Sequence, residues 1–277
     1  MMVGGVKAGA ADPAAAKNVA HGIQLGLVTY NWGRDWDLPT LIRSCEATGF
    51  EGIELRSTHG HGVEITLNKR ERKEVAKRFS DTSIELVGLG SACEYHSADK
   101  AVLEKNIGET KAFIKLCHDV GGTGVKVRPN GLPQDVPVEQ SLEQIGHALN
   151  EVAQFGEQFG VEIRLEVHGR GTSHIPHIKT IMDVATNTNT VICWNCNPKD
   201  LDGKGLNHNF KLVQDRIGII HIHDLRNSNY PWDELFSLLS QSDFAGWTLL
   251  EEGKVPSDVL SAMHVNQRLW ETLVAEQ

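Results

Sequence analysis

The stretch Gly218–Leu225 reads GIIHIHDL, an apolar run in which two histidines stand two residues apart. On an extended backbone alternate side chains point to opposite faces, so His221 and His223 face one side while Ile220 and Ile222 face the other. Isoleucines on one face need an apolar layer, and imidazoles on the other need polar surroundings. This stretch therefore predicts a strand that separates a hydrophobic layer from a polar interior.

Three other strand candidates repeat this alternation. Apolar side chains occupy one face of each, and the other face carries Glu54 and Arg56, then Lys126 and Arg128, then Glu162, Arg164 and Glu166. Buried ionisable groups cost several kcal/mol each unless they are paired or bind a ligand. The pattern predicts one polar pocket. The side chains expected to converge on it are Glu54, Lys126, Arg128, Glu166, His221 and Glu251.

Strand candidates alternate with amphipathic stretches along the chain. The eight strand candidates are IQLGLVTY (23–30), GIEL (52–55), IELVGLG (84–90), GVKVRP (124–129), VEIRLEVH (161–168), TVICWN (190–195), IGIIHIH (217–223) and WTLLEE (247–252). This repeat predicts an α/β fold, a single (β/α)8 TIM barrel over residues 22–277, with its chemistry at the C-terminal ends of the strands. A doubly wound sheet would need a glycine-rich turn after its first strand, and TYNWGRDW (29–36) offers none.

The expected helices have recognisable first residues. Asp37 is the expected cap of the first helix, which has Pro39 in its first turn. The second and third helices are expected to begin at Thr66 and Ser97, and the paired glycines 121–122 are expected to end the third.

Composition describes a globular chain of 277 residues with 40% hydrophobic and 23% charged residues. No apolar run approaches the roughly 18 residues that a membrane helix needs. The net charge of −9 disfavours a nucleic-acid partner, because phosphate backbones attract clustered lysine and arginine. We therefore expect neither a membrane nor a nucleic acid as partner.

Residues 1–21 are rich in small side chains and show no amphipathic period. They lack the basic start and long apolar core of an intact signal peptide, so they are either a flexible lead-in or the trimmed remains of an export signal. We expect them to lie outside the barrel, and their deletion to leave the melting temperature nearly unchanged. The expected location is the cytoplasm, with export after signal removal as the alternative.

Five cysteines, an odd number, argue against a disulfide framework. Cys193 and Cys196 form a CxxC pair in CWNC. A redox CxxC normally opens a helix, whereas Cys193 closes an apolar strand, and the sequence has no second CxxC to complete a zinc site. We interpret both cysteines as packing residues.

The last four strands each end in a side chain that can bind a metal, namely Glu166, Asn195, His221 and Glu251. Carboxylate and imidazole ligands from successive strand ends suit a divalent cation such as Mn²⁺, Mg²⁺, Co²⁺ or Zn²⁺. Any one of these residues alone is explained as well by a salt bridge at the barrel mouth. The set of four favours a metal site.

The sequence resembles the xylose isomerase-like TIM barrel superfamily, the sugar phosphate isomerase/epimerase group, over roughly residues 49–252. The similar segments are TGFEGIEL (48–55), RLEVHG (164–169), IIHIHDL (219–225) and YPWDELFSLLSQSDFAGWTLLEE (230–252). This resemblance implies that His221 is a metal ligand and that Asp224 turns away. It also selects Glu251 as the last ligand, a choice that alternation alone leaves open between Glu251 and Glu252.

One strand departs from the pattern that the resemblance implies. In CWNCNP (193–198), Asn195 and Pro198 stand in the places of an aspartate ligand and of a histidine three residues later. An amide oxygen can bind a hard cation but brings no charge, so we expect weaker metal binding. The absent histidine also removes a substrate contact or a second-metal contact.

The resemblance implies proton transfer next to a sugar carbonyl, with Glu166 and Glu251 as the acid/base pair and the metal polarising the carbonyl. The residues expected to line the pocket and bind the sugar are Glu54, Lys126, Arg128, His168 and His223. For His223, a hydrogen-bonded place at the rim is an equal alternative. The expected partner is a small-molecule carbohydrate, and the oligomeric state stays open, a homo-oligomer included.

Three alternatives remain. A lyase or dehydratase acting on a keto-sugar or keto-inositol would begin with the same proton abstraction. A DNA-repair nuclease of the same superfamily would use a multi-metal cluster, for which His59 and His61 are candidates, but the negative net charge opposes it. A non-catalytic carbohydrate-binding barrel with a degenerate metal site would account for Asn195.

Overall fold

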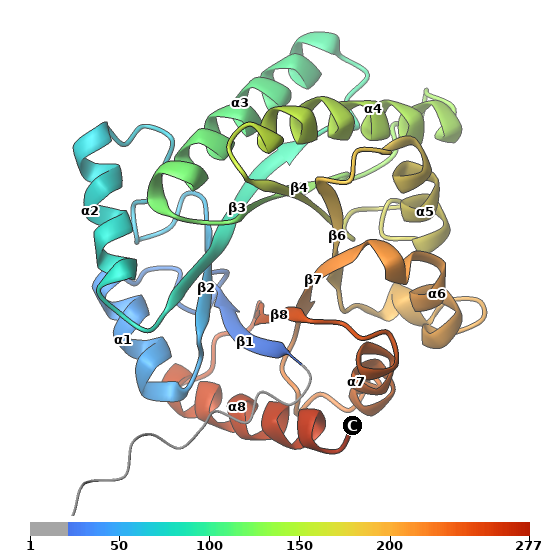
Figure 1. The fold of residues 1–277 in the computed structure, drawn as a ribbon. Helices are drawn as coiled ribbons and strands as arrows, with labels where there is room; N and C mark the ends of the chain where they lie inside the picture. Colours follow the sequence, from blue (N-terminus) through green and yellow to red (C-terminus); the bar gives the residue numbers. More distant parts are fainter. Residues whose placement is uncertain (1–21) are drawn as a thin grey trace, which may run out of the picture.

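The computed structural model describes residues 22–277, in which parallel strands close into a barrel in the order β1 to β8 (Figure 1). The strands are β1 (Ile23–Val28), β2 (Gly52–Arg56), β3 (Glu85–Glu94), β4 (Gly124–Arg128), β5 (Glu162–Glu166), β6 (Thr190–Asn195), β7 (Ile217–Ile222) and β8 (Gly246–Leu250). β1 pairs with both β2 and β8, which closes the ring. The expected (β/α)8 TIM barrel is confirmed. The expectations for residues 1–21 lie outside the described residues.

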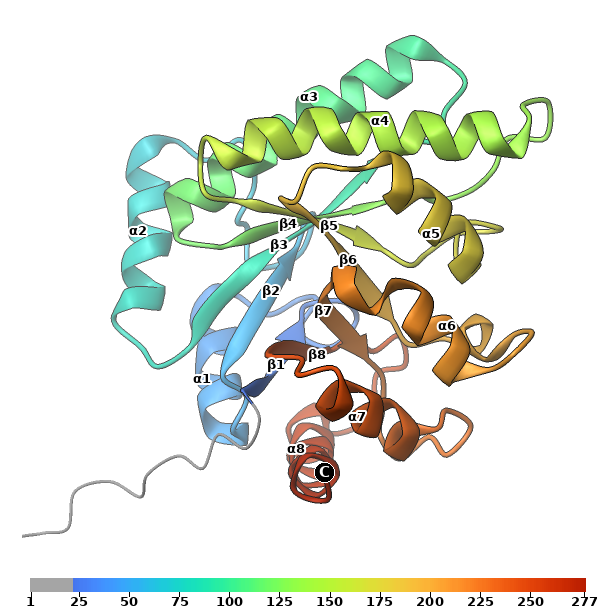
Figure 2. The ribbon, with the colours of Figure 1, turned by 45° about the vertical axis from the view of Figure 1, so that its right-hand side comes forward.

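Helices follow the strands and surround the barrel (Figures 1 and 2). They are α1 (Leu38–Thr48), α2 (Lys69–Ser80), α3 (Lys100–Val120), α4 (Val138–Glu157), α5 (Ile175–Val184), α6 (Leu206–Val213), α7 (Trp232–Gln241) and α8 (Val259–Ala275), with short 3-10 helices η1 (Pro198–Leu201) and η2 (Gln214–Arg216). α1 contacts α8, so the ring of helices closes beside the seam of the strands. Within residues 22–277, the helices are too short or too polar to cross a membrane.

Local hydrogen bonds decide where the helices begin. Asp37 caps α1 as expected, because its carboxylate accepts a backbone amide of the first turn. α2 begins after Asn68 rather than at Thr66, because Asn68 forms a reciprocal capping box. α3 begins after Asp99 rather than at Ser97, because the Asp99 carboxylate accepts an amide of the first turn. The helices therefore lie where the sequence predicts them, but two of them begin later than predicted, because side-chain caps set their first residues.

Alternation along the strands sorts the side chains as the sequence predicts. Ile220 and Ile222 belong to the outer core against the helices, whereas His221 between them points into the barrel. A separate buried cluster comprises Val28, Val87, Cys193, Ile219 and Leu249, with Tyr30 and Trp247 packed against it. Most of these share the inward face of their strands with the polar residues. The interior is therefore apolar in part and polar near the C-terminal ends of the strands.

Arg164 on β5 also lies inside the barrel, where it fills space between strands. Its guanidinium donates to the carbonyl of Val87 at 2.9 Å and to Thr123 Oγ1 at 3.1 Å. Two glycines make room for it, because a Cβ on Gly124 would lie 2.3 Å from Arg164 Cζ and one on Gly88 would lie 2.8 Å from its Nη1. Because Gly88 on β3 and Gly124 on β4 have no side chains, Arg164 can reach from β5 over β4 to β3.

The five cysteines are free and buried. Cys193 lies in the inner apolar cluster and Cys196 in the outer core. Burial raises the pKa of both thiols above the ordinary value. This environment agrees with the interpretation of both as packing residues.

Candidate active site and metal centre

Five ionisable side chains meet at the C-terminal ends of the strands: Glu54 on β2, Lys126 on β4, Glu166 on β5, His221 on β7 and Glu251 directly after β8. We call them the central cluster. Each is buried, with at most 7% of its surface exposed. Strand alternation turns them inward, and the parallel order of the strands brings their ends to one mouth.

Lys126 neutralises part of the central cluster. Its ammonium donates to Glu166 Oε2 at 2.7 Å, and both side chains are nearly fully buried. Burial alone would lower the pKa of Lys126, but the carboxylates of Glu166, Glu251 and Glu54 raise it above its ordinary value. Lys126 therefore stays charged and holds Glu166 in one orientation.

His221 lies between three carboxylates. Its Nδ1 is 3.4 Å from Glu251 Oε2 and 4.0 Å from Glu166 Oε1, whereas its Nε2 is 3.5 Å from Glu54 Oε2. Burial opposes a charge on the imidazole, yet the carboxylates of Glu54 and Glu251 raise its pKa well above the ordinary value. The surroundings of this ring therefore favour positive charge.

Three residues of the central cluster are close enough to share one metal ion. A ligand atom from each of Glu166, His221 and Glu251 lies within 4.8 Å of the other two. Carboxylate oxygens and an imidazole nitrogen are common donors to divalent cations. The ring nitrogens of His221 are buried without a hydrogen-bond partner, and a cation would satisfy one of them. The residues present fit a metal.

Asn195, the fourth expected ligand, lies beside these three. Its Nδ2 donates to Glu166 Oε1 at 3.0 Å, while its Oδ1 is buried without a partner. The strand end is held in turn by Asn197, whose Nδ2 donates to the carbonyl of Asn195 at 2.6 Å. Asn195 thus presents an amide nitrogen to the cluster and keeps an unpaired oxygen that can accept a cation.

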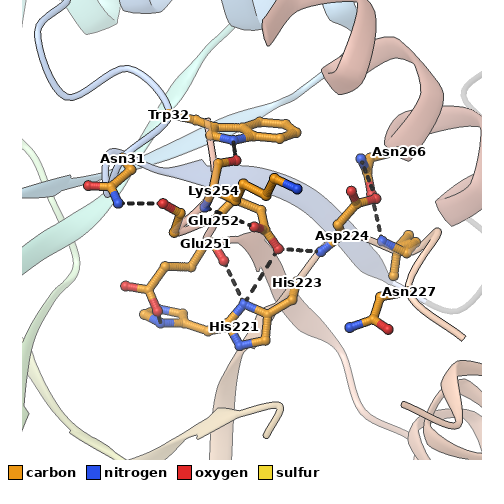
Figure 3. Close-up of polar contacts among 12 residues, drawn as sticks. Asn31, Trp32, His221, His223, Asp224, Asn227, Glu251, Glu252, Lys254 and Asn266 are labelled. Carbon is orange, nitrogen blue, oxygen red and sulfur yellow. Dashed lines mark hydrogen bonds and ion pairs between the residues drawn. The ribbon is translucent and has the colours of Figure 1, made fainter. Parts of the chain in front are cut away.

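Figure 3 shows the hydrogen bonds made by the residues that follow His221 and Glu251. His223 Nδ1 lies 2.6 Å from the carbonyl oxygen of Glu251, and because a carbonyl only accepts, this nitrogen carries the proton. Glu252 instead supports the loop, since its Oε1 accepts the amide of Asp224 at 2.7 Å. Glu252 and Asp224 therefore serve the loops, while Glu251 belongs to the central cluster.

Two residues of the β1–α1 loop hold the segment after Glu251. Asn31 Nδ2 donates to the carbonyl of Gly253 at 2.6 Å, and Trp32 Nε1 donates to that of Lys254 at 2.8 Å (Figure 3). These bonds join the first and last strand–helix loops beside the central cluster. Strand alternation gives no sign of Asn31 or Trp32, because both lie in a loop.

Arg128 pairs with Glu94 at the rim and does not join the central cluster. Its Nη2 lies 2.8 Å from Glu94 Oε1, which also accepts from Asn130 Nδ2, and Asn130 Oδ1 lies 2.7 Å from His168 Nδ1. The reason is register, because β3 places Glu94 directly beside Arg128. Sequence reasoning missed Glu94 and Asn130, and a sugar contact for Arg128 or His168 stays a prediction.

His59 and His61, the histidines considered for a multi-metal cluster, lie in the loop after β2. The ring of His61 accepts from the amide of Val63 at 3.0 Å, and its Nε2 lies 2.8 Å from the carbonyl of Arg56. Burial lowers the pKa of His61 to about 4. Within the described residues, neither histidine belongs to a set of close metal ligands.

A barrel with a buried carboxylate–imidazole cluster at its C-terminal mouth defines a class of (β/α)8 proteins that can hold a cation and a small polar ligand. The chain belongs to the xylose isomerase-like TIM barrel family, whose model matches residues 42–268. The resemblance inferred from short motifs is thereby confirmed.

Individual relatives are distant. The chain is 22% identical over 277 residues to inosose dehydratase from Bacillus thuringiensis, covering 85% of this chain and 91% of that protein. L-ribulose 3-epimerase from Mesorhizobium japonicum is 24% identical over 161 residues, 55% of this chain and 52% of that protein. The solved structure of the IOLI protein with a bound zinc atom matches with a TM-score of 0.78 at 18% identity, over 91% of this chain and 98% of that chain. That likeness shows the fold.

Proposed function

We propose that this protein is a sugar isomerase or epimerase that moves a proton at a carbon next to a sugar carbonyl. The observation that carries the proposal is the placement of two carboxylates around His221 Nδ1, with Glu251 at 3.4 Å and Glu166 at 4.0 Å. Two carboxylates in one buried pocket suit removal of a proton by one and return by the other. Family membership and the epimerase among the relatives support the same reaction class.

The proposal includes a divalent cation. Glu166, His221 and Glu251 would hold it, and Asn195 would add its amide oxygen. When bound, such a cation would polarise the sugar carbonyl and the neighbouring hydroxyl. Zn²⁺, Mn²⁺, Mg²⁺ and Co²⁺ all suit these donors. The zinc atom in the IOLI structure makes zinc the first to test.

The other polar side chains would bind and orient the sugar. Lys126 gives one hydrogen bond to Glu166, which leaves two ammonium protons for a substrate oxygen. His223 would offer Nε2 to a hydroxyl, because its Nδ1 is already engaged. His168 and Arg128 would contact hydroxyls at the rim. Which carboxylate acts first as the base depends on the handedness of the substrate.

A dehydratase is the second candidate, favoured by the match to inosose dehydratase over 85% of this chain. The same carboxylate would remove the proton next to the carbonyl, and an acid would then have to protonate the departing hydroxyl. His223 directly follows β7, two residues beyond His221, and would be that acid.

We further propose that the reaction takes place in the cytoplasm. All five cysteines are free, as is usual in a reducing compartment.

Deuterium exchange tests the proposed function. The metal-loaded protein is incubated in D₂O with ketopentoses, ketohexoses and a keto-inositol, and NMR follows deuterium at the carbon next to the carbonyl. We expect metal-dependent exchange that Glu166→Gln and Glu251→Gln each reduce by about 100-fold or more. Glu162→Gln is the control, because Glu162 pairs with Arg164 away from the central cluster.

The products separate the candidates. An accumulating epimer or isomer identifies an isomerase, and loss of water identifies a dehydratase. If the protein binds sugar but exchanges no proton with each of the four cations tested in turn, the carbohydrate-binding barrel is the explanation. Exchange that survives in both carboxylate variants would contradict the roles proposed for Glu166 and Glu251.

A further inference from the structure

The two nitrogens of His221 face different carboxylates. Nδ1 is turned to Glu251 Oε2 at 3.4 Å and to Glu166 Oε1 at 4.0 Å, the two carboxylates of the candidate metal centre. Nε2 is turned to Glu54 Oε2 at 3.5 Å. The ring is fully buried, so these carboxylates rather than solvent decide which nitrogen keeps its proton once a cation occupies the other.

The Glu54 carboxylate is buried and makes no hydrogen bond among the described residues. Glu54 as a whole is 1% exposed. Space is reserved for it, because a Cβ on Gly90 of the neighbouring strand would lie 2.9 Å from Glu54 Oε1. A buried carboxylate without hydrogen bonds is costly, so its retention calls for a specific partner.

We propose that Glu54 is a positioning residue that accepts the Nε2 proton of His221 and so leaves Nδ1 as the ligand atom for the cation. This inference rests on the proposed function, because it assumes that the Glu166–His221–Glu251 centre takes a metal. A ligating imidazole binds through the nitrogen without a proton, and an acceptor on the other nitrogen selects that tautomer and the ring orientation. Glu54 then acts through His221, in place of the direct sugar contact expected from the sequence.

A plain charge-balancing role is the competing explanation. Glu54 also attracts the buried cations Lys126 and Arg164, which together with His221 lower the pKa of its carboxyl although burial raises it. Removing a carboxylate that only balances those cations would change stability without changing which His221 nitrogen binds a metal. The tautomer of His221 therefore separates the two roles.

Zinc titration and imidazole NMR test the inference, with Zn²⁺ alone as the probe. Wild type, Glu54→Gln and Glu54→Met are compared with Glu162→Gln, a matched variant on the inward face of β5 that does not touch His221. In the zinc-loaded wild type we expect Nδ1 of His221 to be coordinated and Nε2 to be protonated. Glu54→Gln should keep this tautomer, because its amide oxygen still accepts, and bind zinc about 10-fold more weakly. Glu54→Met should bind about 100-fold more weakly, and Glu162→Gln should match the wild type.

Coordination through Nε2 in the wild type would overturn the inference, and so would wild-type zinc affinity in Glu54→Met. If Glu54→Met does not fold, Glu54→Gln decides, because unchanged affinity together with an unchanged tautomer population would also contradict the role. A wild type that binds no zinc overturns it as well. Failure of the proposed function looks different, since a protein that binds zinc as expected but exchanges no sugar proton leaves the assignment of Glu54 intact.

Discussion

Asn195 brings a neutral amide into a site otherwise built from carboxylates, an imidazole and a lysine. Its Nδ2 donates to Glu166 Oε1 at 3.0 Å, and a carboxylate in its place would repel Glu166 when no cation is bound. A bound cation reverses this balance, because it attracts every added carboxylate. Asparagine at position 195 therefore favours the stability of the metal-free protein, whereas aspartate would favour affinity for the metal.

We expect Asn195→Asp to strengthen Mn²⁺ binding by about 1–3 kcal/mol, roughly ten- to a hundred-fold. Without metal, the same variant should melt at a lower temperature than the wild type. Calorimetric titration and melting curves with and without EDTA measure the two effects. Unchanged or weaker affinity would mean that Asn195 does not face the cation.

The charge of Lys126 contributes to the stability of the folded protein. Replacing it with methionine removes the 2.7 Å ion pair and leaves Glu166 buried without its cation. Loss of one partner of a buried pair costs about 3–5 kcal/mol, whereas the exposed pair of Lys111 with Glu151 should contribute less than about 1 kcal/mol. Urea unfolding of Lys126→Met and of the control Lys111→Met compares them. Similar losses in the two variants would contradict the buried charge pair.

At the scale of elements, the turn after β6 contains a carboxyl group that titrates near neutrality. Asp200 in η1 is buried, and its Oδ2 accepts from the hydroxyl of Tyr230 at 2.8 Å. Burial raises its pKa to about 7 from the ordinary 3.8. Because the folded state favours the neutral acid, ionisation costs stability: the cost is absent below the ordinary value and complete above the raised one.

The wild type should therefore lose stability relative to Asp200→Asn as the pH rises from 5 to 8, by about 2.5 kcal/mol. Comparing the two proteins at each pH cancels the contribution of other titrating groups. Urea unfolding at both pH values measures the difference. A gap between wild type and variant that does not change with pH would show that Asp200 keeps an ordinary pKa.

Gly124 on β4 leaves room for the side chain of Arg164. A Cβ on Gly124 would meet the Arg164 guanidinium at 2.3 Å, so Gly124→Ala must displace a buried cation and should cost about 1–3 kcal/mol. Gly108→Ala on α3 is the control, since a Cβ there meets open space and should stabilise the helix by about 0.5–1 kcal/mol. Melting curves compare the two. Equal effects would mean that Arg164 does not occupy the interior as described.

For the whole molecule, the central cluster joins strands from across the barrel. Glu54 comes from β2 and Lys126 from β4, whereas His221 and Glu251 come from β7 and the end of β8. A cation held by Glu166, His221 and Glu251 would link β5, β7 and the end of β8. At a hundred times its dissociation constant, it should raise the free energy of unfolding by about 2.7 kcal/mol.

Melting the protein with increasing zinc, then repeating the series with Glu251→Gln, measures this linkage. The wild type should gain stability with each addition, and the variant should gain less at every concentration, because one anionic ligand has become neutral. Equal gains in both proteins would place the cation away from Glu251.

Local physics explains what the sequence by itself determined. Alternation of side chains along a strand and the count of strand–helix repeats identified the barrel, and the same alternation turned Glu54, Lys126, Glu166 and His221 inward. Helix positions followed from periodicity and caps, although Asn68 and Asp99, rather than Thr66 and Ser97, set two of the starts. These features depend on neighbours in the chain, so they can be read from it.

Only the tertiary structure decided which inward side chains meet, because those contacts depend on register between strands far apart in the chain. Register placed Glu94 beside Arg128 and kept that arginine at the rim. Glycines on two neighbouring strands let Arg164 of β5 reach over β4 to β3. The folded barrel likewise turned the amide nitrogen of Asn195 to Glu166 and set Glu54 against His221. Each of these contacts joins residues at least 29 positions apart, beyond the reach of any local pattern.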